Sequence, residues 1–87
     1  MKKNIKIGIT IEPILNFDMP DFSDLIIKCN PSFVYIGADS KRHNLPEPPE
    51  DKIIALVNSL REAKIEVRLK SNLKRLAPSL FLENGNK

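Results

Sequence analysis

The sequence predicts an α/β fold of order β-α-β-α-β, and three observations carry that prediction. Three short apolar segments, residues 5–12, 33–37 and 65–70, have the composition or the alternation typical of strands. Between them lie two segments whose apolar residues recur at helical spacing. Polar or charged residues follow each apolar segment, as in folds that bind ligands at the carboxyl ends of parallel strands. We therefore expect a three-stranded parallel sheet with two helices.

Residues 5–12 form the clearest predicted strand, because isoleucine alternates strictly with other residues along them. A strand turns successive side chains to opposite faces of its sheet. One face would carry Ile5, Ile7, Ile9 and Ile11, and the other Lys6, Gly8, Thr10 and Glu12.

The first helix is expected to begin near Asp18 and Pro20, since a capping side chain and a proline both favour a first turn. The sequence Asn30-Pro31 would end it. Its apolar stripe, at i, i+3, i+4 and i+7, consists of Phe22, Leu25, Ile26 and Cys29. Cys29 is therefore interpreted as a small core residue.

Residues 33–37 are a short continuous apolar segment, as expected of a strand covered on both sides. A polar, proline-rich loop is expected over residues 39–49. The second helix would open at Pro49, because two acids follow it and suit the positive end of the helix dipole. Its apolar stripe consists of Ile53, Leu56, Val57 and Leu60.

Residues 65–70 alternate again, with Ile65, Val67 and Leu69 opposite Glu66, Arg68 and Lys70. A short helical turn is expected over residues 73–76. The domain organisation follows directly: a single domain over residues 1–82 and a flexible tail over residues 83–87.

Right-handed crossovers would place both helices on one face of the sheet, against the isoleucines. The other face would then be largely polar, although parallel sheets are seldom left bare. Phe33 and Tyr35 would join that face unless Val34 and Ile36 do. A polar inner face is typical of a barrel interior, but three strands cannot close a barrel. The sheet is therefore either part of something larger or a surface for a partner.

Composition narrows the class of protein. The chain has 87 residues and is 41% hydrophobic and 29% charged, as is typical of a globular protein. Its formal net charge of +3 is smaller than nucleic-acid-binding proteins usually carry. Its single cysteine, Cys29, excludes an intrachain disulfide and a multi-cysteine metal site. No segment reaches the ~20 apolar residues needed to span a bilayer, and no signal-peptide pattern is present. We expect a cytoplasmic protein without membrane contact.

Six residues are candidates for ligand or partner contacts: Glu12, Asp39, Arg42, His43, Arg68 and Lys70. Glu12 could hold a ligand or form an ion pair with Arg68 or Lys70 across the sheet. Asp39, Arg42 and His43 lie in a segment that could bind an anion or be an ordinary solvated loop. No residue is assigned a catalytic or metal-binding role.

Four segments of the chain, taken in order, resemble segments of one protein family. Residues 10–18, Thr-Ile-Glu-Pro-Ile-Leu-Asn-Phe-Asp, resemble a segment near the C-terminal end of certain radical S-adenosylmethionine (radical SAM) proteins. Residues 33–40, 44–49 and 66–70 resemble the segments that follow it in that family. The resemblance extends over residues 5–77, and it implies the last portion of a partial TIM-type barrel.

In that family, the inward-facing and carboxyl-terminal ends of these strands face the cofactor or substrate. S-Adenosylmethionine and an iron–sulfur cluster are implied for the full-length family only, because the cysteine triplet that binds the cluster is absent from this chain. Cys29 cannot replace three thiolates. No cofactor is therefore expected in this chain, and activity of the radical SAM type would require completion by another chain.

Three functional hypotheses follow. The first is a non-catalytic α/β interaction domain that associates with itself or with a larger protein. The second is the C-terminal piece of a split radical SAM enzyme, which would supply substrate or cofactor contacts. The third is a small basic nucleic-acid-binding module.

Overall fold

The computed structural model describes residues 6–41 and 44–82, and it has the predicted β-α-β-α-β order. The strands are β1 (Gly8–Ile11), β2 (Phe33–Ile36) and β3 (Glu66–Leu69), and the helices are α1 (Asp21–Lys28) and α2 (Glu50–Glu62). Two 3-10 helices follow, η1 (Ser71–Arg75) and η2 (Pro78–Phe81). The predicted tail, residues 83–87, lies outside the described residues.

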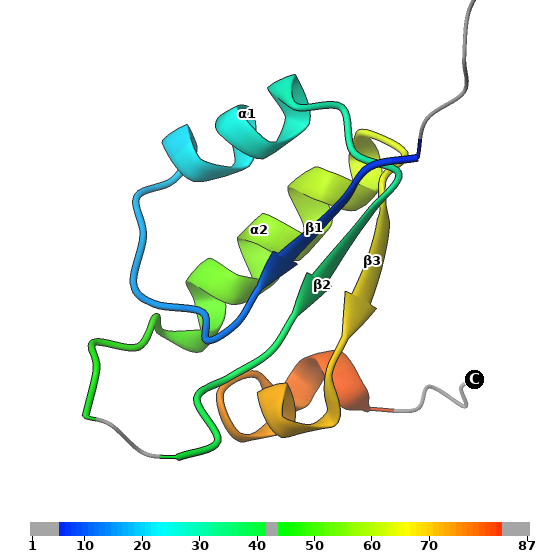
Figure 1. Cartoon of the computed structure of the whole chain (residues 1–87). Coiled ribbons are helices and arrows are strands. Elements are labelled where there is room, and N and C mark those ends of the chain that lie inside the picture. The colour runs from blue at the N-terminus through cyan, green and yellow to red at the C-terminus, as the bar shows by residue number, and fades with distance from the viewer. Residues whose placement is uncertain (1–5, 42–43, 83–87) are drawn as a thin grey trace, which may run out of the picture.

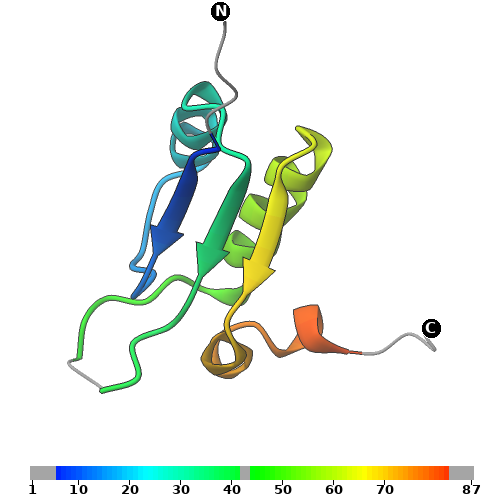
Figure 2. The same cartoon turned by 45° about the vertical axis from the view of Figure 1, so that its right-hand side comes forward.

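The three strands form one parallel sheet in the order β1-β2-β3, which confirms the predicted fold class. Figures 1 and 2 show α1 and α2 on the same face of this sheet, with η1 and η2 beyond the carboxyl ends of the strands. No helix of the described residues covers the other face. The central strand is therefore covered by helices on one side, whereas its continuous apolar sequence predicted cover on both.

The core lies between the sheet and α2. The predicted stripe of α2 is confirmed, since all four residues are fully buried: Ile53, Leu56, Val57 and Leu60. Val34 and Ile36 of β2 meet them from the sheet and are also fully buried. This settles the direction of β2, because Phe33 and Tyr35 must then point to the face without helices.

Two predictions about buried residues are wrong. Leu25 is 60% exposed and Cys29 is exposed, although both were assigned to the apolar stripe of α1. The helix has only eight residues and ends at Lys28, so Cys29 is its C-terminal cap. Its buried residues are Ser23 and Ile26, which means that α1 is rotated from the predicted orientation.

The first strand is shorter than predicted. Ile7 precedes β1 and is 49% exposed, so it does not join the core, whereas Ile9 and Ile11 are half-buried and pack against it. The predicted turn over residues 73–76 is found as η1, displaced toward the N-terminus. Pro78 opens η2, a second short helix that the sequence did not predict.

Candidate functional site

The face of the sheet without helices, here called the open face, is built from aligned rows of side chains. Gly8, Phe33 and Glu66 are aligned across the three strands, and Thr10, Tyr35 and Arg68 form the next row. Small residues of β1 thus lie beside aromatic residues of β2 and long charged residues of β3. Glu12, Gly37 and Lys70 form a further row just beyond the strands.

The Phe33 ring lies across the neighbouring strand. A β-carbon at Gly8 would overlap the tip of this ring, so only glycine leaves room for it. The Arg68 guanidinium carbon stands 4.0 Å from the ring centroid, a cation–π contact. Phe33 is therefore held between the strands on either side, which makes this part of the open face a preformed surface.

Arg68 is also paired with an acid on its own strand. Its Nε donates to Glu66 Oε2 at 2.9 Å, and its terminal nitrogen donates to Glu66 Oε1 at 3.3 Å. The hydrogen bond lowers the pKa of Glu66 and raises the pKa of Arg68. Both side chains stay about half exposed, so solvent screens the pair and its main effect is to orient Arg68.

Glu12 and Lys70 are brought together across the sheet. Lys70 Nζ donates to Glu12 Oε2 at 2.6 Å, and this bond raises the pKa of Lys70. Gly37 lies between them, and a β-carbon there would approach Glu12 Cδ to 3.0 Å. The interpretation of Glu12 as an ion-pair partner is therefore confirmed, with Lys70 as its partner.

Asp39 begins the polar loop at the carboxyl end of β2, and it is only 7% exposed. Its Oδ1 accepts a hydrogen bond from the Lys41 backbone N–H at 3.0 Å. The preceding residue, Ala38, is held by Asn72 of η1, whose side-chain amide accepts from the Ala38 N–H and donates to its C=O, both at 2.9 Å. Asn72 thus takes the place of a neighbouring strand and fixes the backbone that leads into Asp39.

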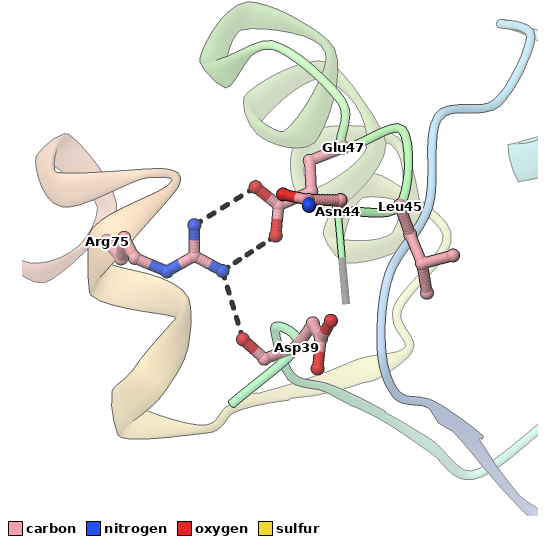
Figure 3. Close-up of a pocket in the computed structure, with 5 residues that line it drawn as sticks. All are labelled: Asp39, Asn44, Leu45, Glu47 and Arg75. Atoms are coloured by element: carbon pink, nitrogen blue, oxygen red, sulfur yellow. Dashed lines mark hydrogen bonds and ion pairs between the residues drawn. The ribbon is translucent and has the colours of Figure 1, made fainter. Parts of the chain in front are cut away.

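Arg75 joins this loop to η1. Figure 3 shows its guanidinium reaching both Glu47 oxygens, at 3.0 and 2.6 Å, and the backbone oxygen of Asp39, at 3.1 Å. The pKa of Glu47 is lowered because Arg75 stabilises the carboxylate.

These contacts border two pockets at the carboxyl edge of the sheet. The larger, of about 500 Å³, is lined by Asp39, Asn44, Leu45, Glu47 and Arg75. The smaller, of about 290 Å³, shares Asp39 and Leu45 with it and extends to Glu12. The carboxyl edge is therefore hollowed around Asp39, where a polar segment follows β2.

The six predicted contact residues fall into separate groups. Glu12 and Lys70 form one ion pair, and Asp39 lies beside both pockets. Arg68 lies on the open face, paired with Glu66 rather than with Glu12. Arg42 and His43 lie outside the described residues.

The prediction missed three residues that shape this edge: Glu47, Asn72 and Arg75. Glu47 is the one acid between two prolines, Pro46 and Pro48, in an otherwise uncharged part of the loop. That isolation is the signal in the sequence that could have marked it.

The iron–sulfur cluster that was considered from the sequence does not fit this chain. A cluster is held by several thiolates, and the one cysteine here lies exposed at the end of α1. Among the described residues, no three His, Cys, Asp or Glu side chains are grouped so that they could hold a metal ion.

Comparisons of this chain with protein-family models, with curated proteins and with solved structures found no match. Within the described residues, neither α1 nor α2 nor any other helix combines the length and apolar character needed to cross a membrane.

Proposed function

We propose that this chain is a non-catalytic α/β interaction domain and that it works by association through its open face. One observation carries the proposal: the described residues place helices on only one face of this parallel sheet, while the other face holds two aromatic side chains, Phe33 and Tyr35. Parallel sheets are almost always covered on both faces. A partner would complete that cover.

The charged side chains of the open face are arranged in a way that favours association. Arg68 is paired with Glu66 and Lys70 with Glu12, so these four charges would enter an interface already compensated. The Phe33 ring is held in place by Gly8 and Arg68, which lowers the entropy lost on binding.

The partner is either another copy of this chain or a larger protein. The resemblance to the last portion of a radical SAM barrel supports the second possibility, because such a portion has strands on both sides of it. The described structure is compatible with that role, since β1 and β3 are both edge strands whose outer sides pair with no other described strand.

The test is the oligomeric state of two charge-reversal variants, measured by light scattering during gel filtration over a range of concentrations. Arg68→Glu places an unpaired acid beside Glu66 on the open face. Arg61→Glu makes the same change at an exposed position of α2, on the opposite side of the sheet. We expect Arg68→Glu to weaken association by about 30-fold or more, as for loss of a charge pair desolvated at an interface.

Arg61→Glu is expected to associate as the parent does. Circular dichroism on the same samples controls for the fold, which neither exposed substitution is expected to change. Equal association of the two variants and the parent would show that the open face is not the interface. A parent that is monomeric at all concentrations would reject association of this chain with itself.

A second candidate function is the C-terminal piece of a split radical SAM enzyme. The observation that favours it is the pair of pockets at the carboxyl edge, where Glu12 and Asp39 could supply substrate or cofactor contacts, with Lys70 paired to Glu12. The other chain would have to carry the three clustered cysteines. Co-expression with such a chain should give a stable complex whose activity falls with Asp39→Asn, and free chains after co-expression would reject this candidate.

A nucleic-acid-binding module is the third candidate. Phe33 and Tyr35 on the open face offer rings on which bases could stack, with Arg68 and Lys70 nearby. Both cations are, however, neutralised by acids, which weakens attraction to phosphates. Retention on single-stranded DNA or RNA that falls steeply with salt would favour it over the first candidate.

A further inference from the structure

We infer that the partner of the open face is a second copy of this chain, packed face to face about a two-fold axis that runs along β2. This inference rests on the proposed function, that the open face associates, and it specifies the partner and the geometry. It follows from the way in which charge and size are distributed across the three strands.

A two-fold axis parallel to β2 exchanges the two edge strands. It places β3 of one copy over β1 of the other, and it keeps every row of side chains at the same height. The row Glu12–Gly37–Lys70 of one copy then faces the same row of the other copy in reverse order. Glu12 lies over Lys70 of the second copy and Lys70 over Glu12, so that the two intrachain pairs become an alternating ring of four charges.

The sizes of the side chains fit the same arrangement. Thr10 of the second copy would face the strand position of Arg68, so that a small exposed side chain lies opposite a long one whose guanidinium leans toward Phe33 of its own copy. Phe33 lies over Gly8 and thus is displaced from β2 toward β1. The two Phe33 rings would therefore lie on opposite sides of the axis rather than collide. Tyr35 lies on the central strand, so the two Tyr35 side chains would meet near the axis.

A face-to-face arrangement about an axis across the strands is less favourable. An axis running across the strands would place each strand over itself in the reverse direction. Arg68, in the middle row, would then face Arg68 of the second copy, and like charges placed opposite one another at an interface are unfavourable. Charge complementarity thus favours the axis along β2 over the axis across the strands.

The size of the open face sets the strength of this contact. Three strands about 4.8 Å apart, with four residues each at about 3.3 Å, cover roughly 200 Å². Stable dimers bury about 800 Å² on each partner. The structure therefore points to a weak dimer that forms and separates with concentration, with the two sheets about 10 Å apart.

Two opposite charge reversals, Glu12→Lys and Lys70→Glu, test the geometry when the variants are studied alone and mixed. Alone, each variant sets like charges opposite one another in its own dimer, lysine over lysine or glutamate over glutamate. We expect each to dimerise at least about tenfold more weakly than the parent. In an equimolar mixture, the paired lysines of the first variant face the paired glutamates of the second, and dimerisation is expected to return to within about threefold of the parent value.

The matched control uses the same charge changes on the opposite side of the sheet. Asp24→Lys and Lys28→Glu reverse an exposed acid and an exposed base on α1. Each is expected to dimerise as the parent does, and mixing them should produce no gain. Sedimentation velocity up to about 1 mM suits an interface this small, and circular dichroism checks the fold of all four variants.

The outcomes separate this inference from the proposed function. Weak single variants with a restored mixture support the two-fold axis along β2. If the single variants are weak but the mixture stays weak, the open face is used and this geometry is wrong. A parent that is monomeric at about 1 mM overturns the second copy as partner and leaves a larger protein to be sought. If the parent dimerises and neither these variants nor Arg68→Glu changes it, the proposed function itself fails.

Discussion

The two faces of this sheet carry alternate residues of the same three strands and differ in their chemistry. One face turns Val34 and Ile36 toward α2, where both are fully buried. The other turns Phe33 and Tyr35 away from the helices, beside ion-paired side chains of β3. The comparison teaches that buried and exposed side chains can alternate along one strand. The domain is therefore stabilised by one face of the sheet and free to associate through the other.

The largest expected effect concerns the covered face. Leu60→Ala removes a fully buried side chain between α2 and the sheet and is expected to lower the free energy of unfolding by about 2–5 kcal/mol. Ile53→Ala should have a similar effect. A loss of this size is close to the whole free energy of unfolding of so small a domain. Chemical denaturation measures it.

Leu25→Ala is the matched control, because this leucine is on α1 but is 60% exposed. Its effect is expected to stay within about 0.5 kcal/mol. If Leu60→Ala and Leu25→Ala unfold at the same denaturant concentration, the assignment of the covered face is wrong.

A smaller effect on stability is expected from Asn72, which contacts the backbone just after the end of β2. Asn72→Ala removes both hydrogen bonds to the Ala38 backbone and leaves partly buried polar groups without these partners. The expected cost is about 1–3 kcal/mol of unfolding free energy. Ser71→Ala, at the exposed neighbouring position, serves as the control and is expected to be close to neutral. Equal stability of the two variants would mean that Asn72 does not hold this loop.

The next largest effect is a dependence of stability on pH, caused by the pair of Glu47 and Arg75. Arg75 lowers the pKa of Glu47 in the folded protein, so the unfolded chain takes up a proton at higher pH than the folded one. The stability from this pair is therefore complete above the ordinary pKa of a glutamate and is lost as pH falls through the lowered value.

Glu47→Gln is expected to lower the melting temperature by about 2 °C at neutral pH, with a difference that shrinks in acid. Thermal melts of parent and variant from neutral to acidic pH measure it. A difference that stays constant down to the lowest pH would show that the ion pair is not its source.

The smallest effect is expected at Cys29. Because this residue is exposed at the end of α1 rather than part of the core, Cys29→Ala should change the free energy of unfolding by less than about 0.5 kcal/mol. It should leave association unchanged as well. A loss of about 1 kcal/mol or more by chemical denaturation would restore the core role that the helical spacing predicted.

The sequence predicted those parts of the fold that depend on local periodicity. The alternation in residues 65–70 and the stripe of α2 each repeat often enough to define a face. The pairing of Glu12 with Lys70 was also within reach, because parallel strands bring their carboxyl ends to one edge. The orientation of α1 was not, since Leu25, Ile26 and Ile27 are consecutive and an eight-residue helix offers too few turns to choose among them.

The pockets could not be predicted for a different reason. Arg75 and Glu47 are 28 positions apart, and Asn72 and Ala38 are 34 apart, so each contact depends on where a loop and a 3-10 helix meet in space. No periodic pattern in the sequence carries that information. Only the isolated acid among prolines marked Glu47 as unusual.

The claim that the open face is the contact surface can be tested most directly with Tyr35. It is the only tyrosine of a chain without tryptophan, so tyrosine fluorescence reports on this face alone. Acrylamide quenching should be measured over the concentration range in which light scattering shows association. We predict that quenching of Tyr35 falls as the associated fraction rises. Quenching that stays constant while the mass increases would contradict the account, because association would then leave the open face uncovered.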